Sequence, residues 1–298
     1  MTISAVREWH ISGRTLTIGQ RTLVMGILNV TPDSFSDGGQ FLSPDAALAQ
    51  AEQMISEGAD IIDIGGESTR PGAALVTAEE EMQRVLPVIS ELAKRTTVPI
   101  SIDTTKSVVA RAALDTGAAI VNDISALRFD LHIADEAAKA GAGLVLMHSR
   151  GTPATMQRLP PVADILEEVI SSLRSSIAMA ERRGVKRESI VIDPGIGFGK
   201  TAEQNVELIA KLDQLATAFP DFPILIGPSR KSFIGRLLDN PKGSADGASA
   251  VRASDRLHGT MASVTAAILK GAHIVRVHDV KAAVETVRIA DALKAEHT

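Results

Sequence analysis

The chain of 298 residues contains no cysteine, no tyrosine and a single tryptophan, Trp9. Without cysteine it can form no disulfide, use no thiolate nucleophile and bind no metal through sulfur. The redox state of its compartment therefore leaves no direct trace in the sequence. Aromatic residues make up only 3% of the chain, so it lacks the stacking platforms on which single-stranded nucleic acids are bound.

The chain also lacks an excess of positive charge and any long apolar run. Its formal net charge of −5 argues against a general surface for nucleic acid or anionic membrane. The opening MTISAVREWH has no apolar core of a signal peptide, and no stretch of about 18 apolar residues occurs elsewhere. We therefore expect a soluble, cytoplasmic protein that binds neither nucleic acid nor membrane.

A short pattern, a Gly-Ala pair followed by an apolar run, recurs along the chain. It begins at Gly58, Gly117, Gly141 and Gly271, as GADIIDI, GAAIVND, GAGLVLM and GAHIVRV. Glycine can adopt the left-handed conformation that ends a helix, and the apolar run suits a strand buried on both faces. Each copy therefore predicts a joint from a helix into a buried strand.

Four further apolar runs, at 23–29, 99–103, 189–193 and 223–227, complete a set of eight predicted strands. Helical periodicity lies between them and is clearest at 162–180. Eight buried strands alternating with helices over about 270 residues predict a single α/β domain, a (β/α)8 TIM barrel, with a doubly wound sheet as the alternative. Residues 1–22 predict an N-terminal β-hairpin that closes the bottom of the barrel, which residues 23–298 form.

The stretch VIDPGIGFGKT, at 191–201, looks at first like a phosphate-binding loop. A Walker A loop needs a glycine five positions before the glycine of Gly-Lys-Thr, and Pro194, which has no N–H to donate, occupies that position. Thr201 followed three residues later by Gln204 is instead a capping box that starts a helix. The role of Asp193 and the glycines must then follow from the rest of the chain.

Polar residues stand at the carboxyl ends of the predicted strands, where TIM barrels carry their active sites. One such residue often does no more than cap the next helix, but seven of the eight strands end in this way. A shared polar mouth is therefore the better interpretation. Its members are Asn29, Asp63, Asp103, Asn122, Asp123, His148, Asp193, Ser229, Arg230, Lys231, Arg276 and His278.

One group of these residues suits a flat heterocycle whose edge alternates donors and acceptors. Asp103, Asn122, Asp193 and Lys231 supply carboxylate, amide and ammonium groups. A carboxylate can receive two hydrogen bonds from an amidine-like edge. These four residues therefore predict a pocket for a polar ring.

A second group, Arg70, Arg276 and His278, supplies positive charge and hydrogen-bond donors. Arg276 and His278 are two apart on one strand and so face the same way, and barrels commonly bind phosphate after strands 7 and 8. The seven histidines show no close pairing on one face, so an oxygen-bound Mg²⁺ suits this chain better than a histidine-bound metal. The mouth is thus expected to hold a polar ring beside an anion.

A series of motifs follows along the chain from residue 23 onward. In order they are MGILNVTPDSFSDGG (25–39), GGESTRPGA (65–73), SIDT (101–104), VNDIS (121–125), LMH and GTPATMQ (146–157), DPGIGFGKT (193–201), GPSRKSFIG (227–235) and RVHDV (276–280). Together they resemble the dihydropteroate synthases of folate biosynthesis, a pterin-binding TIM-barrel family. The first two loop motifs and SRKSFIG are long and specific. Ser149-Arg150, His258 and Thr260 depart from the usual family pattern.

The resemblance implies a transferase, usually a homodimer, that joins 6-hydroxymethyl-7,8-dihydropterin diphosphate to 4-aminobenzoate by dissociative displacement. It implies release of pyrophosphate, use of Mg²⁺ and inhibition by sulfonamides, which mimic aminobenzoate. A methyltetrahydrofolate corrinoid methyltransferase and a non-enzymatic pterin-binding paralogue are the alternatives.

The resemblance also implies roles for individual residues. The pterin pocket would comprise Asp103, Asn122, Met147, Asp193, Lys231 and Arg276. The diphosphate would meet Asn29, Arg70, Arg276 and His278, with Asn29 also meeting Mg²⁺. Aminobenzoate would meet Phe35, Thr69, Pro71, Phe198, Lys231 and Ser232. Asp37, Arg70 and Lys231 would be catalytic.

Overall fold

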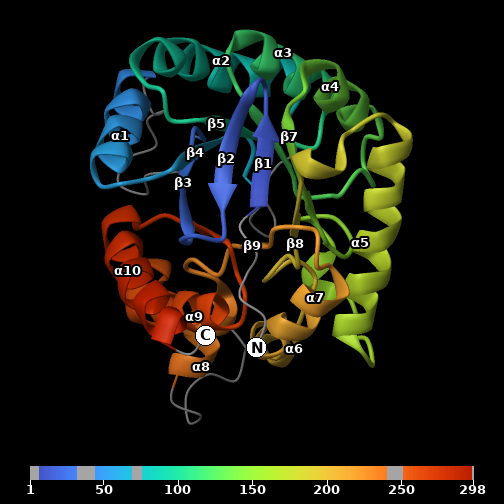
Figure 1. Cartoon of the computed structure of the whole chain (residues 1–298), viewed down its shortest axis with the longest axis vertical. Helices are drawn as coiled ribbons and strands as arrows, with labels where there is room; N and C mark the ends of the chain where they lie inside the picture. Colours follow the sequence, from blue (N-terminus) through green and yellow to red (C-terminus); the bar gives the residue numbers. More distant parts are fainter. Residues whose placement is uncertain (1–6, 32–43, 69–75, 240–250, 297–298) are drawn as a thin grey trace.

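The computed structural model describes residues 7–31, 44–68, 76–239 and 251–296. Within these ranges, eight parallel strands form one sheet, and a two-stranded antiparallel hairpin precedes them in the chain. Figure 1 shows the helices as a ring around the strands, with the hairpin across the centre of the ring. The predicted (β/α)8 barrel is confirmed.

The elements alternate along the chain as the apolar runs predict. The hairpin comprises β1 (Arg7–Ile11) and β2 (Arg14–Ile18). The barrel strands are β3 (Leu23–Asn29), β4 (Ile61–Gly65), β5 (Ile100–Asp103), β6 (Ile120–Asp123), β7 (Gly143–Met147), β8 (Ile190–Asp193), β9 (Leu225–Ile226) and β10 (Ile274–Val277). The helices are α1 (Pro44–Ser56), α2 (Ala78–Arg95), α3 (Ser107–Thr116), α4 (His132–Ala140), α5 (Ile165–Arg182), α6 (Ala202–Ala210), α7 (Leu212–Ala218), α8 (Ser232–Leu238), α9 (Leu257–Leu269) and α10 (Val280–Glu296), with short 3₁₀ turns η2 (Met156–Arg158), η3 (Arg187–Ser189) and η4 (Ala253–Arg256).

The barrel is nearly closed. Its strands pair in the order β8-β7-β6-β5-β4-β3-β10-β9, and a parallel bridge between Ile192 and Ile224 joins the two ends. The strand expected at 223–227 is reduced to β9. Pro223 has no N–H to donate, so its pairing there is limited to its carbonyl, which accepts from the Ile192 N–H at 3.0 Å.

Side-chain caps determine where α5 and α6 begin. The helix expected from residue 162 starts at Ile165, because the Asp164 side chain accepts from the Glu167 N–H at 3.0 Å and so acts as the N-cap. The capping box at Thr201 and Gln204 is confirmed, since each side chain accepts a hydrogen bond from the backbone of the other, at 3.2 and 3.1 Å. The glycine-rich stretch before Thr201 therefore ends where α6 begins.

The outer helices bury one face against the strands. In α5 the buried apolar residues are Ile165, Leu166, Val169, Ile170, Leu173, Ile177 and Ala180, at the i, i+3, i+4 spacing of an amphipathic helix. They join the apolar layer between the helices and the sheet. In the parts of the chain that the structure describes, no helix is both long and apolar enough to cross a membrane.

The hairpin closes the amino-terminal end of the barrel. Trp9, Ile11 and Ile18 are fully buried and cluster with residues at the starts of the strands, among them Leu23 and Ile274. The indole N–H of Trp9 donates to the Ser189 carbonyl at 2.9 Å. A Cβ atom at Gly143 would lie 2.6 Å from Ile11 and 2.9 Å from the Trp9 ring, so only glycine leaves room for this floor.

We predict that Trp9→Ala lowers the free energy of unfolding by about 3–5 kcal/mol, because it opens a large cavity and leaves the Ser189 carbonyl without its donor. Urea unfolding followed by circular dichroism measures the change. Val108→Ala on the exposed side of α3, where Val108 is 42% exposed, is the control and should change stability by no more than about 0.5 kcal/mol. Equal effects of the two substitutions would contradict a structural role for the hairpin floor.

Candidate active site

The carboxyl ends of the strands bring charged and amide side chains together at one end of the barrel. Asp103 ends β5, Asn122 lies beside it in register on β6, and Asp193 ends β8. Arg276 comes from β10, where its neighbour in register is Met25 of β3. Parallel strands with a common direction place these ends on one face, as the strand-end pattern predicts.

Arg276 is the centre of this group. Its Nε donates to Oδ2 of Asp63 at 2.6 Å, and its Nη2 donates to Oδ2 of Asp103 at 2.7 Å. Asn122 donates to the same Asp63 oxygen at 2.9 Å. Asp63 is fully buried, and a buried carboxylate needs such charged or polar partners. The guanidinium therefore joins strands β4, β5 and β10.

Asp63 is one of the strand-end residues to which the sequence assigns no pocket. The sequence marks it only as a polar residue near a strand end, whereas in the structure it lies two positions before the end of β4 and pairs directly with Arg276. Its position inside the apolar run DIIDIG was the available signal. A carboxylate in a buried strand requires a cation or hydrogen-bond donors in the barrel interior.

Burial shifts the titration of these groups toward neutral pH. Burial raises the pKa of Asp103 to about 7, although Arg276 opposes the shift. Burial raises the pKa of Asp193 to about 6, opposed by the hydrogen bond from the Gly195 N–H. Burial and the nearby charge of Arg276 lower the pKa of Lys231 to about 8. Such shifts in one cluster are typical of functional sites.

Lys231 and Phe198 form the other side of the mouth. The Lys231 ammonium lies 3.8 Å from the centre of the Phe198 ring, within the range of a cation–π interaction. Phe198 packs in a small apolar cluster with Ile124, Met147 and Met156, separate from the two main cores. An apolar aromatic wall thus lies next to the charged group that contains Arg276.

The backbone before Lys231 is held in an unusual conformation. Arg230 has φ +58°, a left-handed value that is uncommon for a residue other than glycine. Its guanidinium donates to both Asp279 oxygens, at 3.0 and 2.5 Å, its N–H donates to Thr260, and its carbonyl accepts from Arg256. Strain of this kind persists where surrounding contacts enforce it. Thr260, which departs from the family pattern, therefore contacts the residue directly before Lys231.

The structure also places the remaining predicted residues that it describes. Asn29 ends β3, and Ser232 begins α8 directly after Lys231. His278 follows β10, and its Nδ1 lies 2.9 Å from the Ser229 hydroxyl. Five predicted residues lie outside the described residues: Phe35, Asp37, Thr69, Arg70 and Pro71.

Among the residues that the structure describes, few oxygen atoms could meet a magnesium ion. Within the described ranges, no group of three or more His, Asp or Glu side chains could hold a metal. Asn29 Oδ1 and Asp103 Oδ2 lie 3.8 and 3.7 Å from the point where a Cβ at Gly65 would stand, so both oxygens lie close to the same glycine. Mg²⁺ often takes only one or two protein ligands and completes its shell with substrate phosphates and water. The residues present fit an ion bound in that way.

Comparisons with known proteins agree with this geometry. Residues 25–278 match the family described as pterin binding enzyme. A dihydropteroate synthase from Synechocystis is 50% identical over 275 residues, which cover 92% of this chain and 91% of the relative. The chain belongs to the dihydropteroate synthase family.

Solved structures of dihydropteroate synthases share the fold. One from Xanthomonas albilineans, described with 4-aminobenzoic acid, has a TM-score of 0.85 and 41% identity, covering 98% of this chain and 99% of that one. One from Yersinia pestis, described with a sulfonamide drug complex, has a TM-score of 0.86 and 41% identity, covering 96% and 99%. The predicted dihydropteroate synthase family and its TIM barrel are confirmed.

We predict that Asp193→Asn stabilises the fold relative to the parent at pH 7.5 and much less at pH 4.5. The folded-state pKa of Asp193 is about 6, above the ordinary value of about 4 for an unfolded chain. The parent therefore loses stability as pH rises from about 4 to about 6, by up to about 3 kcal/mol, whereas asparagine does not titrate. Urea unfolding at several pH values measures the difference, and parallel pH profiles would contradict it.

Proposed function

We propose that this chain condenses 6-hydroxymethyl-7,8-dihydropterin diphosphate with 4-aminobenzoate, giving 7,8-dihydropteroate and pyrophosphate for folate biosynthesis. The observation that carries the proposal is the pairing of Arg276 with Asp63 and Asp103 beside the Lys231–Phe198 contact. Such a mouth offers acceptors for a polar ring, a cation for an anion and an aromatic wall for a second ring.

In this proposal the pterin lies between Asp103, Asn122 and Asp193, near Met147 and Lys231. The two carboxylates accept hydrogen bonds from the amino and ring N–H groups, and a charged acceptor makes such bonds about twice as strong as neutral ones. The guanidinium plane of Arg276 lies against the ring, because a planar guanidinium stacks on aromatic faces. The raised pKa values of Asp103 and Asp193 reflect burial that a donor-rich ligand would offset.

The diphosphate is proposed to meet Asn29, Arg70, Arg276 and His278. Mg²⁺, when bound beside Asn29, would supply charge neutralisation for the departing diphosphate. The amide oxygen of Asn29 lies close to Gly65, as does Oδ2 of Asp103. The cationic side chains hold the leaving group in place and stabilise its growing negative charge.

Aminobenzoate is proposed to lie against Phe198, with Lys231 and Ser232 beside it. Phe35, Thr69 and Pro71 complete this pocket in the proposal. An ammonium next to an aromatic ring suits a substrate that is itself an aromatic carboxylate. Sulfonamides, as mimics of aminobenzoate, would compete for the same wall.

The proposed reaction is a displacement in which bond breaking precedes attack. The C–O bond to diphosphate breaks with its electron pair on oxygen, and Arg70, Arg276 and His278 stabilise that charge. The dihydropterin shares the positive charge left on the methylene carbon, which Asp37 also offsets. The neutral amine then forms the C–N bond and loses its proton to solvent. Each 1.4 kcal/mol of such stabilisation is about tenfold in rate.

Two other functions are separable from this one. A corrinoid-dependent methyltransferase would transfer a methyl group from methyltetrahydrofolate, and a pterin-binding paralogue would bind without turnover. Incubation of the pure protein with pterin diphosphate, Mg²⁺ and labelled 4-aminobenzoate separates them. Labelled dihydropteroate and equimolar pyrophosphate are expected, and formation of neither product would exclude the proposed synthase.

We predict that Asp103→Ala abolishes measurable pterin binding. The substitution removes an acceptor for the ring and leaves a buried Arg276 N–H unpaired, a loss of roughly 1–3 kcal/mol for each neutral group and more for a charged one. Calorimetric titration with 6-hydroxymethylpterin measures the affinity. Asp115→Ala on the exposed surface of α3 is the matched control. If Asp103→Ala binds the pterin as tightly as the parent does, Asp103 does not belong to the pocket.

Arg70→Ala is expected to reduce kcat by at least tenfold while leaving the fold intact, because it removes a charge proposed to stabilise the leaving diphosphate. Arg111→Ala, an exposed arginine of α3, controls for loss of surface charge. Circular dichroism checks the fold and pyrophosphate release gives the rate. A folded and fully active Arg70→Ala would take Arg70 out of the mechanism.

A homodimer is also part of the proposal. Large apolar side chains are exposed on α8 and α10, including Leu237 at 63%, Leu238 at 53% and Ile289 at 65%. Burying such exposed apolar surface against a second copy of the chain is favourable, and light scattering of the pure protein measures its mass.

We also propose a cytoplasmic location, which cell fractionation tests.

A further inference from the structure

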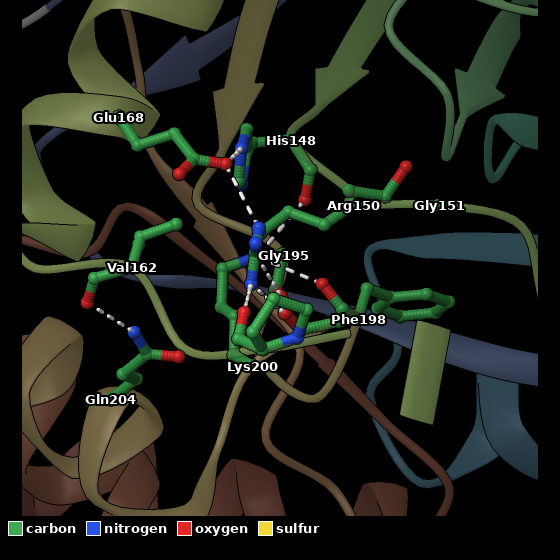
Figure 2. A network of polar contacts seen from close by, with 12 residues as sticks. His148, Arg150, Gly151, Val162, Glu168, Gly195, Phe198, Lys200 and Gln204 are labelled. Atoms are coloured by element: carbon green, nitrogen blue, oxygen red, sulfur yellow. Dashed lines mark hydrogen bonds and ion pairs between the residues drawn. The ribbon is translucent and has the colours of Figure 1, made fainter. Parts of the chain in front are cut away.

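Lys200, the lysine of the Gly-Lys-Thr sequence, points back into its own turn. It is buried, with 8% of the residue exposed. Its ammonium donates to the carbonyls of Gly195 at 2.8 Å, Phe198 at 3.2 Å and His148 at 3.3 Å. Figure 2 shows these bonds converging on Lys200 from the turn and from the segment after β7. The lysine therefore closes the glycine-rich turn and fastens it to a neighbouring strand end.

Carbonyl oxygens are the direct hydrogen-bond partners of the Lys200 ammonium. Burial lowers the pKa of Lys200 to about 7, while the carboxylates of Asp193 and Glu168 oppose the shift at longer range. Glu168 pairs instead with Arg150, at 3.0 Å. Three carbonyls around one ammonium satisfy all three of its donors, so removing it would leave three buried acceptors without this partner.

Two glycines allow the turn to lie directly on the backbone of the β7 segment. Gly195 and Gly199 have φ values of +70° and +71°, which favour glycine. A Cβ atom at Gly195 would stand 1.8 Å from the His148 carbonyl oxygen, and one at Gly199 would stand 2.7 Å from that of Arg150. The turn and the segment after β7 are thus packed as one unit.

Arg150 adds a second tie between the same segments. Its Nη1 donates to the carbonyls of Gly199 and Pro160, each at 3.0 Å. Its Nε lies 3.0 Å from the Glu168 carboxylate of α5. Figure 2 shows Arg150 lying beside Lys200, with Glu168 on its other side. The guanidinium therefore links the turn, the segment after β7 and the outer helix.

Phe198 lies in the turn that Lys200 and Arg150 hold in place. Its carbonyl accepts from Lys200, its N–H donates to the Gly195 carbonyl at 3.2 Å, and its ring lies under the Lys231 ammonium. The position of the ring relative to Lys231 is consequently determined by the backbone of the turn. Neither Lys200 nor Arg150 is among the proposed substrate contacts.

We propose that Lys200, assisted by Arg150, is a positioning residue that holds the Phe198 ring in place as a wall for the aromatic amine substrate. This inference rests on the proposed function, in which Phe198 meets aminobenzoate. It accounts for a lysine buried among carbonyls in a motif that does not bind phosphate. Displacement of the turn would therefore weaken the binding of aminobenzoate more than the binding of pterin diphosphate.

The kinetic test compares Lys200→Met with Ile177→Ala. Methionine has a similar length but no donors, whereas Ile177, buried in α5, controls for lost stability away from the turn. In Lys200→Met we expect KM for aminobenzoate to rise about tenfold or more, equivalent to about 1.4 kcal/mol, and KM for pterin diphosphate to change less than about threefold. Ile177→Ala should change neither KM. Equal changes in both KM values of Lys200→Met would overturn the proposal.

Hydrogen exchange tests the positioning role without any turnover. The amide of Gly195 donates to Asp193 and that of Gly197 donates to Asn205, each at 2.6 Å. Both amides should exchange faster in Lys200→Met than in the parent, and at the parent rate in Ile177→Ala. Unchanged exchange in Lys200→Met would overturn the inference. A parent that forms no dihydropteroate would instead overturn the proposed function, so the two failures are distinguishable.

Arg150 variants keep the inference testable if Lys200→Met does not fold. Arg150→Met should raise KM for aminobenzoate, and Arg150→Lys should restore part of it, because lysine keeps the charge beside Glu168 but loses the forked donation. When both single variants fold, the double variant Lys200→Met, Arg150→Met should cost less than the sum of the two, since both residues hold one turn. Additive effects, or Arg150→Met with the parent's KM, would contradict a shared positioning role.

Discussion

The whole mouth of the barrel depends on a guanidinium that is held in the interior by two carboxylates. Arg276 lies between Asp63 and Asp103, which come from different strands. A buried charge of this kind is stable only with close partners, and despite burial these two carboxylates raise the pKa of Arg276. The strands β4, β5 and β10 must therefore keep their register for the charges to meet.

That requirement connects the far end of the barrel to the site. The hairpin and Gly143 fill the floor with apolar contacts, so the strands cannot slide without opening a cavity. Register at the floor determines where the same strands end at the mouth. The stability of the apolar layers is thus what permits the destabilising burial of Asp103, Asp193 and Lys231, a cost that proteins commonly accept at functional sites.

Much of the fold and part of the site could be predicted from the sequence. The Gly-Ala joints and buried runs specify parallel strands, and the strand-end pattern brings Asp103, Asn122, Asp193 and Arg276 to one face. The pairing of Arg276 with Asp63 could not be predicted, because that contact depends on how the curved sheet brings β10 and β4 together. The side-chain contacts of Lys200 could not be predicted either, since its acceptors include the carbonyl of His148, which follows β7. Local motifs carry no record of such tertiary partners.

The position of Trp9 has a consequence for observing the molecule. It is the one tryptophan of the chain, it is fully buried in the floor, and the aromatic residue assigned to the mouth that the structure describes is a phenylalanine, Phe198. Tryptophan emission from this protein therefore reports the packing of the floor alone. Loosening of the floor can therefore be followed by tryptophan emission, separately from product formation at the mouth.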